Sequence, residues 1–401
     1  MEVKQFKYLI LTYLFSAPVS LAAEWSGQLG METRLFTETA AYAGQHGHNS
    51  SLFFQPEFYH ENNEATESFT LVPFIRLDQH DDERSHADIR ELTWLKVMDN
   101  LEIRLGVRKV FWGVTESQHL VDIINQTDAV DSVDGEEKLG QPMVNLSYIT
   151  ELGSFDVFLL PYFRERTFAG REGRLRSQPY VDTTTTLYES ADKEKHLDYA
   201  FRWAHSMDEW DFGASYFRGT SRDPRFVVGT DSVGRSVLNP YYDLITQIGV
   251  DVQATFDSWL WKLEGIHRSG LSGNGDSSYN AFTAGFEYTF YSAIGEATDI
   301  GLVFELLRDD RGNSATTPFQ KDVMLGLRFN LNDEQSTEAL IGMVRDLDND
   351  SVIYSVEASR RLSEHLKLTI ESRQYSNIPI NAALYSYSSD DFVQFELSYY
   401  F

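Results

Sequence analysis

The chain has 401 residues, no cysteine, a formal net charge of −27 and an aromatic content of 14%. The absence of cysteine excludes disulfide scaffolds, thiolate nucleophiles and cysteine-based zinc sites. The negative charge argues against nucleic acid as a partner, because phosphate backbones bind basic surfaces. After the first 23 residues no segment is continuously apolar for about 18 residues, so no membrane-spanning helix is predicted.

The acidic charge has two interpretations. The acids lie either in solvated external loops or around a vestibule that attracts cations. Most of them fall between the predicted strands described below, which favours the first interpretation.

The amino terminus has the three-part pattern of a secretory signal peptide. Basic residues are followed by a short apolar core at 8–15 and by small residues that suit cleavage after Ala22 or Ala23. The apolar core is shorter than the roughly 20 residues with which a helix crosses a bilayer. We therefore predict a signal peptide over 1–23 and an exported mature chain over 24–401.

The mature chain repeatedly shows the period-two alternation of strands that have one apolar and one polar face. No linker or repeat divides it, so we predict one all-β domain: a single transmembrane antiparallel up-and-down β-barrel of about 16–18 strands. The candidate strands cover 24–36, 50–60, 66–78, 85–98, 100–111, 141–150, 153–164, 195–206, 209–219, 241–256, 257–269, 278–290, 297–308, 319–330, 336–346, 351–361, 363–375 and 388–401.

The predicted connections alternate between tight turns and long gaps. The long gaps lie at 112–140, 165–194, 220–240 and 376–387. This alternation is typical of barrels with short periplasmic turns and long external loops. An even number of strands then places both termini on the periplasmic side.

The fifth predicted strand carries the most distinctive sequence. Its outward residues are apolar, and Glu102, Arg104 and Arg108 face the lumen. Trp112-Gly113 ends it, and we expect the indole at the membrane interface and the glycine at a sharp bend. The segment 112–140 is long enough to fold into the lumen and narrow the bore. Candidate pore-lining residues in this region are Glu102, Arg104, Arg108, Trp112, Asp122 and Asn125.

This region also resembles a known family. The resemblance is carried by Gly106, Trp112-Gly113 and Asp122-Ile-Ile-Asn125, with a second short piece at Tyr216-Phe-Arg-Gly-Thr-Ser-Arg-Asp-Pro224. The family consists of porin-like β-barrels of the Gram-negative outer membrane whose function is unknown. Gln126 stands where the family often has proline. Alginate-export barrels are similar only in the strand ending Gly106-Val-Arg108. The first resemblance implies a pore or transport role and brings no substrate, cofactor or catalytic residue.

Five arginines crowd one predicted external loop: Arg164, Arg166, Arg171, Arg174 and Arg176. They suit an anion-attracting constriction or a clamp on an acidic polymer. The alternative, which we favour, is contact with lipopolysaccharide phosphates or pairing with acidic loops. We keep Arg164, Arg166 and Arg171 as candidate constriction residues.

Residues for catalysis or metal binding are sparse. His46-Gly-His48 is the only close histidine pair, and the sequence indicates no third ligand. The acidic run 78–83 lacks the glycine spacing of a calcium loop, and we interpret it as a solvated loop tip. No nucleophile elbow is present. We therefore expect no enzyme activity, no cofactor and no metal site.

The last ten residues alternate in period two and end on Phe401. They resemble the terminal strand by which outer-membrane barrels are recognised by their assembly machinery. The sequence thus predicts a porin-like channel for passive or facilitated diffusion of a small solute in the outer membrane of a Gram-negative bacterium. It would contact outer-membrane lipid and lipopolysaccharide. Two alternatives stay open: an exopolysaccharide-export or scaffold barrel with periplasmic partners, and a barrel-based surface hydrolase.

Overall fold

The computed structural model describes residues 23–271, 277–295 and 297–401. In this part of the chain, eighteen antiparallel strands form one sheet, and each pairs with the next along the wall. The first strand, β1 (Ala23–Phe36), also pairs with the last, β21 (Phe392–Tyr400), so the sheet closes on itself. Residues 1–22 of the predicted signal peptide lie outside the described residues.

The wall runs from β1 to β21 in chain order. Its other strands are β2 (His48–Glu61), β3 (Glu67–Asp78), β4 (Ala87–Met98), β5 (Leu101–Arg108), β6 (Gln141–Thr150), β7 (Gly153–Leu160), β9 (Asp198–Met207), β10 (Trp210–Thr220), β13 (Leu244–Phe256), β14 (Trp259–Leu271), β15 (Ser277–Ile294), β16 (Thr298–Asp309), β17 (Lys321–Asn330), β18 (Glu338–Asp346), β19 (Val352–Arg361) and β20 (Leu366–Ser376).

The predicted fold class is confirmed, and every predicted strand is present with ends that shift by a few residues. The sequence prediction missed a second, three-stranded sheet of β8 (Leu187–Tyr188), β11 (Arg225–Thr230) and β12 (Ser236–Tyr242), which lies within the long connections. The helices of the described residues are short 3₁₀ turns, and none is long and apolar enough to cross a membrane.

The two faces of the wall differ in polarity. On β17, Leu325 and Leu327 point outward and are 40% and 42% exposed, whereas Asp322 and Met324 point inward and are buried. Aromatic side chains gather beside the tight turns, where Trp210 contacts Phe256 and Trp259 contacts Tyr288. An apolar outer band with aromatic residues at its edge is the surface that a bilayer requires of a transmembrane barrel.

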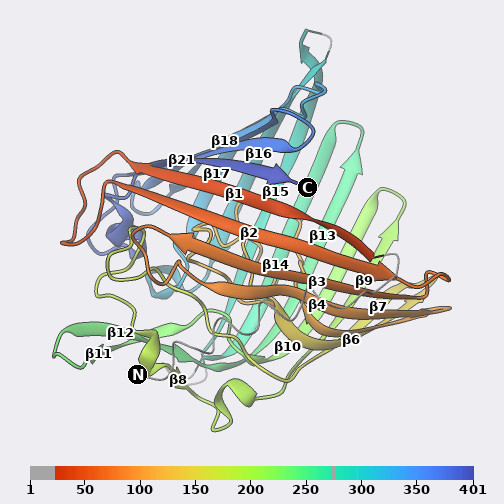
Figure 1. Cartoon of the computed structure of the whole chain (residues 1–401), viewed down its shortest axis with the longest axis horizontal. Helices are drawn as coiled ribbons and strands as arrows, with labels where there is room; N and C mark the ends of the chain where they lie inside the picture. The colour runs from red at the N-terminus through yellow and green to blue at the C-terminus, as the bar shows by residue number, and fades with distance from the viewer. Residues whose placement is uncertain (1–22, 272–276, 296) are drawn as a thin grey trace.

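The two ends of the barrel differ in the length of their connections. One end has turns as short as 99–100 and 208–209, together with the carboxyl terminus. The other end has long connections such as 109–140, 161–197 and 221–243. Figure 1 shows β11 and β12, in green, beyond the end of the wall that lies away from the carboxyl terminus.

Outward and inward positions should respond differently to charge. Leu325→Arg should destabilise the barrel by roughly 2–4 kcal/mol, because an arginine near the bilayer midplane lacks water. The control Thr369→Arg should cost far less, because Thr369 alternates with outward residues on β20 and faces the polar interior. Urea unfolding of vesicle-inserted protein measures both changes, and equal losses would contradict the assigned faces.

Candidate pore and its crossing loop

Residues 109–140, which join β5 to β6, form a loop that crosses the inside of the barrel; we call it the crossing loop. The backbone N–H groups of Val114 and Thr115 donate to Glu264 on β14 at 2.7 and 3.0 Å. The N–H of Glu116 donates to Glu305 on β16 at 2.7 Å. Because these acceptors point inward from strands far from β5 along the wall, the predicted fold-back of 112–140 is confirmed.

Apolar packing fills one side of the lumen. Val121, Ile123 and Ile124 of the crossing loop are at most 1% exposed. They pack against inward side chains of the wall: Met143, Phe158, Leu160, Ala200, Phe217, Ile245, Ile266, Tyr279 and Ala281. The wall from β6 to β15 therefore encloses a packed core around the crossing loop.

A buried group of charges fastens the crossing loop to β3 and β4. Arg90 contacts Asp128 at 2.7 Å and Asp131 at 2.6 Å, and Arg76 contacts Asp131 at 2.7 Å. We call these four residues the latch. Burial alone would raise the pKa of Asp128, but contacts with His86 and Arg90 outweigh burial and hold that pKa well below its usual range. Asp128 is therefore ionised at neutral pH.

Charged side chains face the open side of the lumen. Arg328 on β17 contacts Glu116 of the crossing loop at 2.6 Å. Arg373 on β20 bridges Asp134 of the crossing loop and Glu357 on β19, at 2.8 and 3.2 Å. The Glu357 side chain is 47% exposed although it points inward. An exposed carboxylate inside the barrel marks a lumen that admits water.

Trp112 does not lie at the membrane interface, so that prediction is wrong. The side chain is 5% exposed, packs on Phe158 with ring centroids 5.6 Å apart, and lies under the guanidinium of Arg202. The chain turns inward after Arg108, where β5 ends. Gly113 is needed at this bend: its φ is +148°, and a Cβ would lie 2.7 Å from a ring nitrogen of His119.

Asn125 and Asp122 are enclosed within the crossing loop. Asn125 accepts from the backbone N–H of Val110 and donates to the carbonyls of Arg108 and Leu139, at 2.8–2.9 Å, so it ties the two ends of the loop together. Asp122 lies 3.4 Å from Lys138, and burial raises the pKa of its carboxyl. Their predicted role in lining the pore stays a prediction.

The charged residues of β5 point inward as the alternation predicts. Glu102 and Arg104 form an ion pair with each other, and both side chains are about one-fifth exposed. Arg108 donates to the amide oxygen of Asn145 at 2.9 Å. Arg104 is therefore paired but within reach of solvent inside the barrel.

The arginines of the connection 161–197 are paired with aspartates of other segments. The ion pairs are Arg164 with Asp88, Arg166 with Asp223, Arg171 with Asp231 and Arg174 with Asp390. Arg176 donates to carbonyl oxygens and to Gln178. The favoured interpretation of this cluster was lipopolysaccharide contact or pairing with acidic loops. These ion pairs agree with the second, and contact with lipopolysaccharide stays a prediction.

The acidic run 78–83 is a solvated loop tip only in part, because Gln79, Asp82 and Glu83 are exposed whereas Asp78 and Asp81 are held by other segments. Asp78 is paired with Arg84, and Asp81 is 4% exposed. Asp81 accepts the backbone N–H of Gly170 at 2.9 Å. A Cβ on Gly173 would lie 2.1 Å from Asp81, so a glycine there lets the 161–197 connection approach this carboxylate.

The sequence reasoning missed the wall side of the latch. Arg76 and Arg90 lie on predicted strands, and their faces follow from the alternation with outward Ile75, Leu77 and Ile89. The alternation therefore predicts that Arg76 and Arg90 face the lumen. It does not predict their contacts with Asp131, because those contacts depend on where the crossing loop folds.

No protein-family model and no curated protein matches the sequence. Among solved structures, a triple mutant of the Rh. blastica porin matches with 9% identity and a TM-score of 0.45, covering 94% of this chain and 100% of that chain. OmpT, an outer membrane protein of Vibrio cholerae in its trimer form, matches with 8% identity and a TM-score of 0.47, covering 94% and 99%. Similarities at this level carry no argument about this chain, so its fold assignment rests on the strand pairing.

The class that the fold defines is a large transmembrane β-barrel with a loop folded into its lumen, which is a porin-like architecture. The resemblance at Gly106, Trp112-Gly113 and Asp122–Asn125 implied such a barrel, and the barrel is confirmed.

Removing Arg90 from the latch should destabilise the protein strongly. Arg90→Met leaves Asp128 and Asp131 buried with weakened pairing, and such losses cost about 3–5 kcal/mol. The matched control Arg345→Met breaks an exposed pair with Asp350 and should cost about 0–1 kcal/mol. Urea unfolding in detergent compares the two variants, and a small equal loss in both would refute a stabilising latch.

Proposed function

We propose that this protein is a porin-like channel of a Gram-negative outer membrane, through which a small hydrophilic solute diffuses passively or with facilitation. The observation that carries the proposal is the half-exposed inward carboxylate of Glu357, which contacts Arg373 beside Asp134 of the crossing loop. Water can reach this side chain inside a wall whose outside is apolar. A partly filled, hydrated barrel suits diffusion better than a fully packed one.

The proposed location rests on three further features. The amino terminus has the composition of a secretory signal peptide. The start of β1 and the finish of β21 both lie at the rim of the barrel that has short turns, as in outer-membrane barrels. The carboxyl-terminal residue Phe401 pairs with Gly27 through backbone hydrogen bonds, so it completes the closing strand. We propose that the assembly machinery recognises this strand, and that the outer band contacts lipid and lipopolysaccharide.

The charge of the open lumen supports a preference for cations. Glu136 of the crossing loop, which contacts His119, and Glu357, which contacts Arg373, have side chains that are 52% and 47% exposed. The basic side chains nearby are more enclosed, at 29% for Arg328 and 14% for Arg373. Mobile ions therefore meet more accessible negative than positive charge, which raises the local cation concentration.

Planar-bilayer recording of the purified protein tests the proposal. The expected result is stepwise conductance that saturates or blocks with one class of solute. A sealed bilayer would contradict it. In that case hydrolysis of an ester or peptide would support the surface-hydrolase alternative. The absence of both conductance and hydrolysis would support the export or scaffold alternative.

Two charge changes should move ion preference in opposite directions. Glu357→Gln removes an accessible negative charge and should lower the cation/anion permeability ratio, whereas Arg104→Ala removes a positive charge and should raise it. Arg235→Ala is the matched control, because Arg235 lies in the hairpin between β11 and β12, outside the barrel wall. Reversal potentials in a salt gradient measure the ratio, and an unchanged potential for both lumen variants would remove these residues from the pore.

A further inference from the structure

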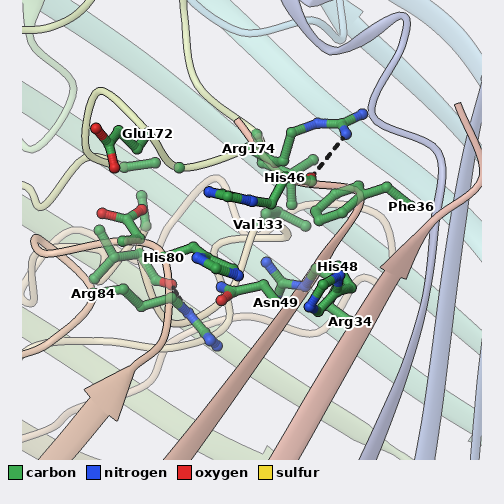
Figure 2. Close-up of a pocket in the computed structure, with 16 residues that line it drawn as sticks. Arg34, Phe36, His46, His48, Asn49, His80, Arg84, Val133, Glu172 and Arg174 are labelled. Atoms are coloured by element: carbon green, nitrogen blue, oxygen red, sulfur yellow. Dashed lines mark hydrogen bonds between the residues drawn. The ribbon is translucent and has the colours of Figure 1, made fainter. Parts of the chain in front are cut away.

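Three histidines from separate stretches meet at the loop end of the barrel. His46 lies in the connection between β1 and β2, His48 begins β2, and His80 lies between β3 and β4. The rings of His46 and His80 stack with centroids 3.7 Å apart, and His48 lies edge-on to His80 at 5.5 Å. Figure 2 shows them around one small pocket.

Backbone contacts hold the three histidines near one another. The N–H of Gln79 donates to the carbonyl of Ser50 at 2.9 Å, which joins the His80 connection to β2. The guanidinium of Arg174 donates to the carbonyl of His46 at 3.2 Å, drawn as the dashed line in Figure 2. The histidines are therefore brought together by the fold rather than by their spacing in sequence.

The pocket has room and an unused ligand atom. Its volume is about 20 Å³, which is close to that needed for a single water-sized occupant. The Nε2 atom of His80 is buried and has no hydrogen-bond partner in the described residues.

The arginines that line the pocket are each paired with a carboxylate. Arg34 and Arg84 contact Glu32 at 3.6 and 2.8 Å, and Arg174 contacts Asp390. The exposed carboxylate of Glu172 also lines the pocket. A divalent cation entering the pocket would therefore approach three imidazoles and the Glu172 carboxylate, whose ligand atoms do not yet converge within 4.8 Å in this structure.

We propose that His46, His48 and His80 bind a divalent transition-metal ion of the kind that imidazole prefers, such as Zn²⁺ or Ni²⁺, at the mouth of the barrel. His46 and His48 are exposed, so their rings have room to turn from the stacked arrangement until their nitrogens converge with that of His80. A bound ion would join the β1–β2 connection to the β3–β4 connection. The proposal does not depend on the pore function.

A second group of potential ligands provides a contrast. Single ligand atoms of His86, Asp128 and Asp131 lie within 4.8 Å of one another. Both aspartates are engaged by Arg90, whose guanidinium lies 2.7 and 2.6 Å from them. A metal ion at this position would be repelled by the buried guanidinium of Arg90 or would have to displace it. We therefore assign these two aspartates to the latch and not to a metal site.

Zinc titration of the full-length protein in detergent, with a chromophoric chelator as competitor, tests the proposal. Excess Mg²⁺ suppresses weak binding to surface carboxylates, which prefer hard cations. We expect one equivalent of tightly bound Zn²⁺, and at least about tenfold weaker binding in His80→Ala and His46→Ala. His365→Ala, in the turn between β19 and β20, is the matched control and should bind as the unaltered protein does.

Two outcomes would overturn the proposal. One is the absence of a stoichiometric Zn²⁺ site in the unaltered protein. The other is binding that survives His80→Ala and is lost in His86→Ala, which would assign the ion to the latch group. Unfolding midpoints measured without metal show whether each variant is folded, and Zn²⁺ should raise the midpoint only where the three histidines are intact.

Discussion

The pairing of β1 with β21 is the constraint on which the rest of the structure depends. In lipid every backbone N–H and carbonyl needs a partner within the protein, and only a closed sheet supplies one for every strand. Residues of β1 and β21 pair along this junction, for example Leu35 opposite Val393. Once the wall is closed, every long connection must either extend past its end or turn into its lumen.

The crossing loop turns into the lumen, and interactions with charged side chains stabilise it there. Its backbone N–H groups bind the inward carboxylates of Glu264 and Glu305, and its own aspartates bind Arg76 and Arg90. Buried ions are costly unless they are paired, and arginine pairs well because its planar fork contacts two acceptors at once. The acidic chain thus uses its few buried arginines to fix the position of a loop that partly fills the bore.

The wall was predictable because alternation is a local property. Each strand, such as 141–150, reveals its two faces without reference to any other strand. Features that depend on contacts distant in sequence were not predictable. Trp112 was predicted at the membrane interface because the sequence does not show that the chain turns inward before it. The strands β11 and β12 were predicted as part of a loop. The contact between His46 and His80 was not predicted, because the two residues are far apart in sequence.

The central claim is that residues 109–140 lie inside the barrel against the far wall, and an engineered disulfide tests it most directly. A Cβ built on Gly249 of β13 lies 3.6 Å from the Cβ of Val121, which is within the range for a disulfide. The chain has no other cysteine to compete. Val121→Cys combined with Gly249→Cys should crosslink on mild oxidation in the membrane-inserted protein, whereas each single variant should not. Two thiols that stay reduced and react freely with an impermeant reagent would contradict the account.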